Sequence, residues 1–153
     1  MASRAIEIKP QLNVKLTMEE MRYITLFQDI TGVTPKDCVI MDELGLVVFI
    51  VDSDKLGQAI GRKGTNTRYL NKLINREIEI VGWADNLESF VKSIFMPARV
   101  YRVQLVESSS RKTVYVHVDS KDKGIAIGKN GRNVAKAKML LKRYYLIDNV
   151  VIV

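Results

Sequence analysis

A glycine motif with adjacent positive charge occurs twice in this chain of 153 residues. Its first copy is Ile60-Gly61-Arg62-Lys63-Gly64, and its second, 67 residues later, is Ile127-Gly128-Lys129-Asn130-Gly131. Two glycines three apart permit backbone angles and a close approach that side chains would block. Because a helix is expected to follow each second glycine, its free N-terminal amides and the neighbouring cations favour an anion. Each copy therefore predicts a site for a negatively charged ligand.

The sequence around the motif is repeated as well. Comparison of residues 47–76 with residues 114–143 gives 12 identities in 30 positions, Asn66 and Asn133 among them. A single copy could equally be a tight helix–helix corner with a solvated basic surface, since short glycine motifs often occur by chance. Two copies in the same context favour binding, and the repeat indicates two similar modules.

Hydrophobic periodicity predicts the elements that hold the two motifs. Thr17 and Glu20 form a capping box before a helical apolar stripe that ends at Gly32, and Asp85 with Glu88 suggests a second capped helix. Both halves then read helix, strand, strand, helix, helix, strand. The expected elements are helix 17–31, strands 38–41 and 46–51, helices 54–60 and about 65–75, strand 77–81, a helix from 85 to about 95, strands 100–106 and 113–118, helices 121–127 and 131–145, and strand 147–153.

Composition narrows the class of ligand. The net charge of +7 and the pI near 9.5 favour a polyanionic partner. From Lys55 to Arg76 there are six basic residues and no acidic one, and from Lys123 to Ile147 there are seven and none. One cysteine and one histidine give no support for a disulfide or a zinc site. The longest apolar run has eight residues, so no membrane segment is expected, and a cytoplasmic location fits.

Other phosphate-binding motifs fit less well. The stretch from Gly124 to Asn130 resembles a P-loop but is one residue short, ends in Asn and follows a helix. The Rossmann fingerprint is absent from both copies. A nucleotide-using enzyme is therefore disfavoured, and no catalytic residue, metal ligand, cofactor or small-molecule substrate is expected.

Both motifs, in the wider stretches Leu56–Gly64 and Lys123–Gly131, resemble the signature of the KH domain. In that family the Gly-x-x-Gly loop clamps about four nucleotides of single-stranded nucleic acid. The resemblance implies an α+β fold of two tandem type II (prokaryotic) KH domains. Each would be α-β-β-α-α-β, with a three-stranded sheet covered on one face by helices. The first would be residues 1–82, with a short N-terminal arm, and the second residues 83–153, with a fixed relative orientation because the join has little slack.

Two such domains in series resemble the archaeal NusA-like transcription factors, and the stretch Leu16–Cys38 strengthens the match. Bacterial members also carry a polymerase-binding domain and an OB-fold domain, for which this chain has no room. The resemblance implies a monomeric factor in transcription elongation or termination that binds single-stranded RNA, with RNA polymerase as a candidate partner. A KH-containing ribosomal or ribosome-biogenesis protein remains the alternative.

The resemblance also implies roles for individual residues. Ile60 and Ile127 would form the apolar floor under the bases, and Arg68, Arg132 and Lys136 would make secondary phosphate contacts. The RNA backbone would contact the loop residues Gly61, Arg62, Lys63, Gly64, Gly128, Lys129, Asn130 and Gly131. The second loop has one charge fewer, so the first is predicted to hold phosphate more strongly. Tyr69, Tyr144 and Tyr145 are predicted to pack in the core or between modules.

Overall fold

The computed structural model describes residues 8–12 and 15–153, which fold into two compact units. The N-terminal unit holds residues 15–84. The C-terminal unit holds residues 85–153 together with residues 8–12. Each unit has its own three-stranded sheet.

The N-terminal unit follows the predicted order of elements. Its parts are α1 (Met18–Thr31), β1 (Asp37–Met41), β2 (Leu46–Asp52), α2 (Leu56–Ile60), α3 (Thr65–Ile74) and β3 (Glu77–Trp83). The central strand β2 pairs antiparallel with β1 and parallel with β3. Helices α1 and α3 pack against the strands and against each other, and Phe27 of α1 stacks on Phe49 of β2 with ring centroids 4.3 Å apart. Alternate residues of β2 thus join the helices in one core.

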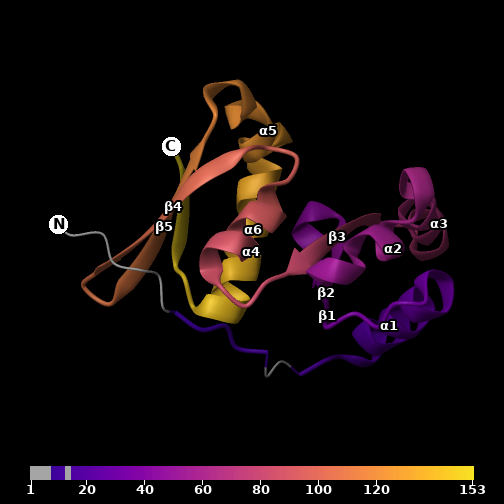
Figure 1. Ribbon diagram of the computed structural model, residues 1–153. Helices are drawn as coiled ribbons and strands as arrows, with labels where there is room; N and C mark the ends of the chain where they lie inside the picture. Colours follow the sequence, from indigo (N-terminus) through magenta and orange to yellow (C-terminus); the bar gives the residue numbers. More distant parts are fainter. Residues whose placement is uncertain (1–7, 13–14) are drawn as a thin grey trace. The chain divides into compact units, whose positions relative to one another are not determined.

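The C-terminal unit repeats this topology. Its parts are α4 (Leu87–Phe95), β4 (Val100–Ser108), β5 (Arg111–Val118), α5 (Lys123–Ile127), α6 (Arg132–Tyr145) and β6 (Asn149–Ile152). The central strand β5 pairs antiparallel with β4 and parallel with β6. Figure 1 shows α4 and α6 on the same side of this sheet, where Phe90 meets Tyr144 edge to face at 5.7 Å. Both units are thus α+β modules with the same strand pairing.

Local signals explain where the helices begin and end. The Thr17 side chain accepts the Glu20 N–H and the Glu20 side chain accepts the Thr17 N–H, so the predicted capping box is present. Gly32 ends α1 in the left-handed conformation that favours glycine. The predicted cap of α4 is one residue too early, because the side chain of Asn86, and not that of Asp85, accepts the Ser89 N–H.

Other boundaries differ from the expected ones. The helix expected over 54–60 is a 3-10 turn, Ser53–Lys55, followed by α2, and the last strand is only four residues long. Strand β3 continues to Trp83, one residue past the boundary expected after residue 82. The N-terminal arm is expected with the first module, but the Gln11 N–H donates to the carbonyl of Tyr144 at 2.8 Å, in the C-terminal unit.

No helix among the residues described is long and apolar enough to cross a bilayer.

Candidate nucleic-acid interface

The two glycine motifs fold into turns with the same backbone. Each turn links a five-residue helix, α2 or α5, to the long helix that follows it. At the three matched positions that have positive φ, the φ and ψ angles of the two turns agree to within 3°. The φ and ψ pairs are 79° and 167° at Gly61 against 79° and 166° at Gly128, 55° and 30° at Lys63 against 58° and 28° at Asn130, and 71° and 22° at Gly64 against 73° and 19° at Gly131. The sequence repeat is therefore a repeat of local structure.

The first glycine of each turn cannot be replaced without strain. Its combination of positive φ and extended ψ is accessible essentially to glycine alone. A Cβ atom on Gly61 would lie 2.8 Å from Cγ of Asn66, and one on Gly128 would lie 2.8 Å from the backbone nitrogen of Asn133. Backbone conformation and close contact thus both require glycine here.

An asparagine on the following helix braces each turn. Asn66 Nδ2 donates to the carbonyl of Gln58 at 3.3 Å, and Asn133 Nδ2 donates to the carbonyl of Ile125 at 2.7 Å. Each bond ties the first turn of the long helix to the short helix before it. Neither residue was predicted to have a role, although their identity in the repeat was the signal that could have found them.

The third position of each turn holds a non-glycine residue in the left-handed region. Asparagine tolerates this conformation better than lysine does, so Asn130 is less strained than Lys63. The first turn has extra support: Arg68 Nη1 donates to the carbonyl of Lys63, and Thr65 Oγ1 donates to the carbonyl of Arg62. The matched positions in the second turn are Ala135 and Arg132, so the repeat did not keep this support.

Some amides expected to face the ligand are used inside the turn. The Gly64 N–H donates to the carbonyl of Gly61 and the Gly131 N–H to that of Gly128, both at 3.0 Å. The Thr65 N–H, at the start of α3, donates to the carbonyl of Arg62. The expectation of free N-terminal amides is therefore contradicted for these amides, which bond within the turn.

The charged loop residues are presented to solvent. Arg62, Lys63, Lys129 and Asn130 are all exposed, while Ile127 is 43% exposed and Ile60 is half-buried beside its turn. Cations, apolar contact surface and glycine backbone thus meet at each turn. Such a surface can hold a phosphate chain while apolar side chains touch the groups attached to it.

The three predicted secondary contacts behave differently. Arg68 is exposed, but part of its donor capacity holds the Lys63 carbonyl. Arg132 is half-buried and interacts with other residues of the described chain. Lys136 is only 3% exposed, so its prediction as a phosphate contact is not supported by its position. The reason is helical phase, since Lys136 precedes Leu140 and Tyr144 at four-residue intervals on the buried side of α6.

The three tyrosines for which packing was predicted differ in burial. Tyr144 and Tyr145 are buried as expected, at 0% and 2% exposure. Tyr69 is 53% exposed, so it is not a core residue, which was one of the two packing positions expected for it. On α3 it is Leu70 that lies in the core, and the adjacent position projects about 100° away from it.

Ion pairs remove some cations from the basic stretches. Arg76 contacts Asp42 at 2.9 Å and Glu19 at 3.7 Å. Lys142 contacts Asp148 at 2.8 Å, and this contact, with the Lys112 N–H, lowers the pKa of the Asp148 carboxyl. Within residues 8–12 and 15–153, the cations between the glycines of the two turns form no ion pair. The same part of the chain contains no group of three or more His, Cys, Asp or Glu side chains that could hold a metal ion.

Known proteins are similar to this chain in sequence, and one solved structure is similar to it in fold. The family model of the NusA-like second KH domain matches residues 87–150. A probable transcription termination protein NusA from Halococcus morrhuae is 33% identical over 139 residues, which are 91% of this chain and 98% of that protein. The protein of the same name from Methanocaldococcus jannaschii is 29% identical over 140 residues, covering 92% and 75%. The crystal structure of APE1850 superimposes with a TM-score of 0.82 at 36% identity, covering 90% of this chain and all of that one. The chain therefore belongs to the family of archaeal NusA-like proteins.

Proposed function

We propose that this protein binds single-stranded RNA during transcription elongation or termination, as two tandem type II KH domains that each hold the RNA backbone at one Gly-x-x-Gly turn. The observation that carries the proposal is the agreement of the two turns in backbone angles, bracing asparagine and exposed cations. The relatives named as transcription termination proteins support the process. RNA polymerase is a candidate partner on the same ground.

The chemistry of each turn suits a phosphodiester chain. Arg62, Lys63 and Lys129 neutralise phosphates without reading sequence. Ile60 and Ile127 offer apolar surface beside them. Glycine at the first and last positions lets the nucleic-acid backbone approach closely, because no side chain intervenes.

The two turns are expected to contribute unequally. The first has two cations and a third, Arg68, that fixes the carbonyl of Lys63. The second has Lys129 alone between its glycines, with Asn130 in place of Lys63. Because phosphate binding scales with the number of cations that displace counterions, the first turn should bind RNA more tightly.

Charge reversal at the turns tests the proposal. We expect the double variant Arg62→Asp, Lys63→Asp to bind a single-stranded RNA at least tenfold more weakly, measured by fluorescence anisotropy across a salt series. The slope of log K against log salt should fall by about 0.7 for each phosphate that the variant no longer neutralises. Lys129→Asp should reduce both the slope and the affinity by less.

The matched control is the double variant Arg22→Asp, Lys92→Asp. It changes the net charge by the same amount as the loop variant, but on helices α1 and α4. An equal loss in the control would mean that only overall charge matters. Unchanged affinity in the loop variant, with the fold intact by circular dichroism, would refute the assignment of the turn. Co-purification of polymerase subunits from cell extract would favour transcription, whereas co-purification of ribosomal subunits would favour the ribosomal alternative.

A further inference from the structure

The sheet of the C-terminal unit carries helices on one face, and its other face has a different set of side chains. Along β5, Val114, Val116 and Val118 are buried at 0–2% exposure, while the residues between them are half-buried. The β4 residues that pair with these half-buried residues of β5 lie on the same side of the sheet as they do. We call this side the open face; its residues are Tyr101, Arg102, Gln104, Val106, Thr113, Tyr115 and His117.

The two units differ most clearly at this face. The residues of β2 that match Thr113, Tyr115 and His117 are Leu46, Val48 and Ile50, all fully buried. In the C-terminal unit the same positions are polar or aromatic and accessible. The polar and aromatic character of these positions is therefore a feature of one module only.

A β-bulge directs an aromatic side chain onto the open face. The register passes from Val100 opposite Val118 to Arg102 opposite His117, so Tyr101 has no partner on β5. Its side chain is 66% exposed, and its ring centroid lies 6.0 Å from that of His117. The His117 ring is itself held by a 2.7 Å hydrogen bond between its Nε2 and Gln104 Oε1. Two adjacent rings, one of them fixed, thus stand at the end of the sheet.

Positive charge lies next to these rings. Arg102 follows Tyr101 and is exposed. A cavity of about 410 Å³ beside Tyr101 is lined by Lys123, Ser120, Asp119, Val118 and Val153 as well. The one side-chain carboxylate in this lining, that of Asp119, accepts the Lys121 N–H at 3.3 Å. A ring, a hydroxyl and a cation therefore border the same hollow.

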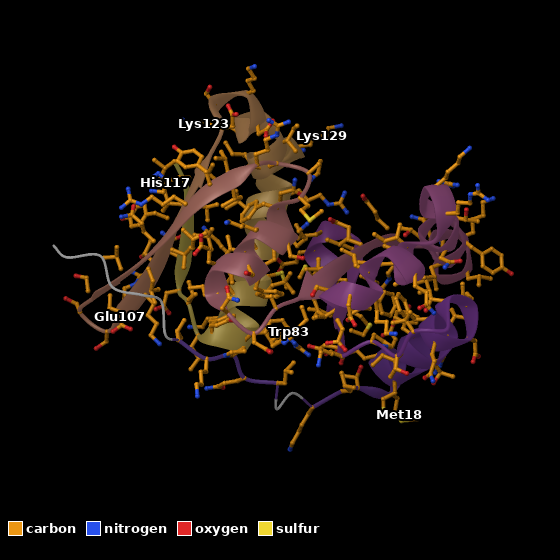
Figure 2. All side chains as sticks on the ribbon, viewed as in Figure 1. Met18, Trp83, Glu107, His117, Lys123 and Lys129 are labelled. Atoms are coloured by element: carbon orange, nitrogen blue, oxygen red, sulfur yellow. The ribbon has the colours of Figure 1, made fainter. Side chains whose placement is uncertain are left out.

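This hollow lies close to the second glycine turn. Lys123 begins α5, and Lys129 follows its end, as Figure 2 shows for both side chains. Helix α5 is five residues long and rises about 7 Å, which is short compared with a strand of four nucleotides. A single strand leaving Lys129 can thus reach Lys123 and Tyr101 without leaving the unit.

We propose that the Tyr101–His117 end of the open face binds one or two further nucleotides of the RNA strand held at the Gly128–Gly131 turn. Bases stack on aromatic rings without sequence preference, and each stacked base contributes about five- to 150-fold in affinity. Lys123 and Arg102 neutralise the accompanying phosphates. This assignment rests on the proposed RNA binding and adds to it a second subsite, made of different residues.

RNAs of two lengths separate the subsite from the turn. A tetranucleotide fills the turn alone, whereas a dodecanucleotide of the same composition reaches both. We expect Tyr101→Ala in the full chain to weaken dodecanucleotide binding about tenfold in anisotropy titrations, and Tyr101→Phe to restore it, because phenylalanine keeps the stacking surface. Val106→Ala, on the far part of the open face, is the control and should leave affinity unchanged.

His117 supplies an independent signal, since it is the single histidine of the sequence. Its ring resonances should shift with the dodecanucleotide and stay still with the tetranucleotide, whose binding is followed at the amides of Gly128 and Gly131. Tetranucleotide binding with no effect of Tyr101→Ala and no His117 shift would overturn the subsite and leave the proposed function standing. No binding of either RNA would overturn both. A His117 shift with purified RNA polymerase but with neither RNA would assign the face to a protein partner and refute the proposal.

Discussion

Gly61 and Asn66 are packed so closely that a Cβ atom on the glycine would lie 2.8 Å from Cγ of the asparagine. The close packing arises because the Asn66 side chain lies across the turn and donates to the carbonyl of Gln58. Gly128 and Asn133 repeat the arrangement in the C-terminal unit. The shape of each turn therefore depends on a residue outside the Gly-x-x-Gly motif.

Substitution of Gly61 by alanine should be costly. The backbone at φ 79° and ψ 167° would be strained by about 1–3 kcal/mol, and Asn66 would have to move. We expect the free energy of unfolding in guanidinium chloride to fall by that amount, and RNA affinity to fall with it. Gly57→Ala is the matched control, because a Cβ atom there meets nothing within 4 Å and alanine favours the helix. An equal loss in both variants would show that the turn has no special requirement.

Removal of the bracing asparagines should destabilise the two turns to different extents. Asn133→Ala removes a hydrogen bond of 2.7 Å and should cost about 1 kcal/mol. Asn66→Ala removes one of 3.3 Å and should cost less. Chemical denaturation of both variants measures the order. A larger loss for Asn66→Ala would contradict the structural ranking.

Tyr145→Phe should be neutral or stabilising. The Tyr145 hydroxyl is buried without a hydrogen-bond partner among the residues that the structure describes, and phenylalanine removes that desolvated group. Burial, with the charge of Asp85 as a second cause, raises the pKa of Tyr145 from 10.0 to about 12. Because the folded protein holds this proton more tightly than the unfolded chain does, the free energy of unfolding of the unsubstituted protein falls as the pH rises from 10 toward 12.

Denaturation of both proteins at pH 7 and at alkaline pH tests this prediction. The difference in unfolding free energy should shift in favour of Tyr145→Phe above pH 10. A marked destabilisation by Tyr145→Phe at pH 7 would instead show that the hydroxyl has a partner.

Asp148→Asn should weaken the fold at neutral pH. The carboxylate contacts Lys142 Nζ and accepts the Lys112 N–H, both at 2.8 Å, and these contacts lower its pKa from the ordinary 3.8. A lowered pKa contributes stability above the unfolded value that is lost as the pH falls through the folded one. Asparagine keeps an acceptor for Lys112 and removes the charge. At pH 7 the free energy of unfolding in urea should therefore be lower for Asp148→Asn than for the unsubstituted protein, and this difference should disappear as the pH falls to 2. A difference that stays constant with pH would exclude the ion pair as its cause.

Local features of the fold followed from sequence because neighbouring residues alone determine them. The capping box of α1 and the left-handed glycines depend on side chains and φ angles within four residues. The repeat of residues 47–76 in residues 114–143 then extended the prediction for the first turn to the second. Helices and strands on either side of both turns were accordingly predicted with small errors at their ends.

Residues of the candidate site were predicted less well, because their exposure depends on long-range packing. Lys136 and Tyr69 occupy matched positions in the repeat, yet the lysine is 3% exposed and the tyrosine 53%. The two helices bury different sets of positions against neighbouring elements, and sequence spacing alone does not determine which face of a helix is buried. The Arg68 bond to the Lys63 carbonyl and the bulge at Tyr101 likewise came only from the folded chain.

The sequence by itself thus determined that two glycine turns with adjacent cations stand between helices, since glycine spacing, charge and periodicity are local properties. Only the tertiary structure decided which cations reach solvent and which face of the second sheet stays open. Those outcomes depend on interactions between residues far apart along the chain, such as the pairing of Arg102 with His117.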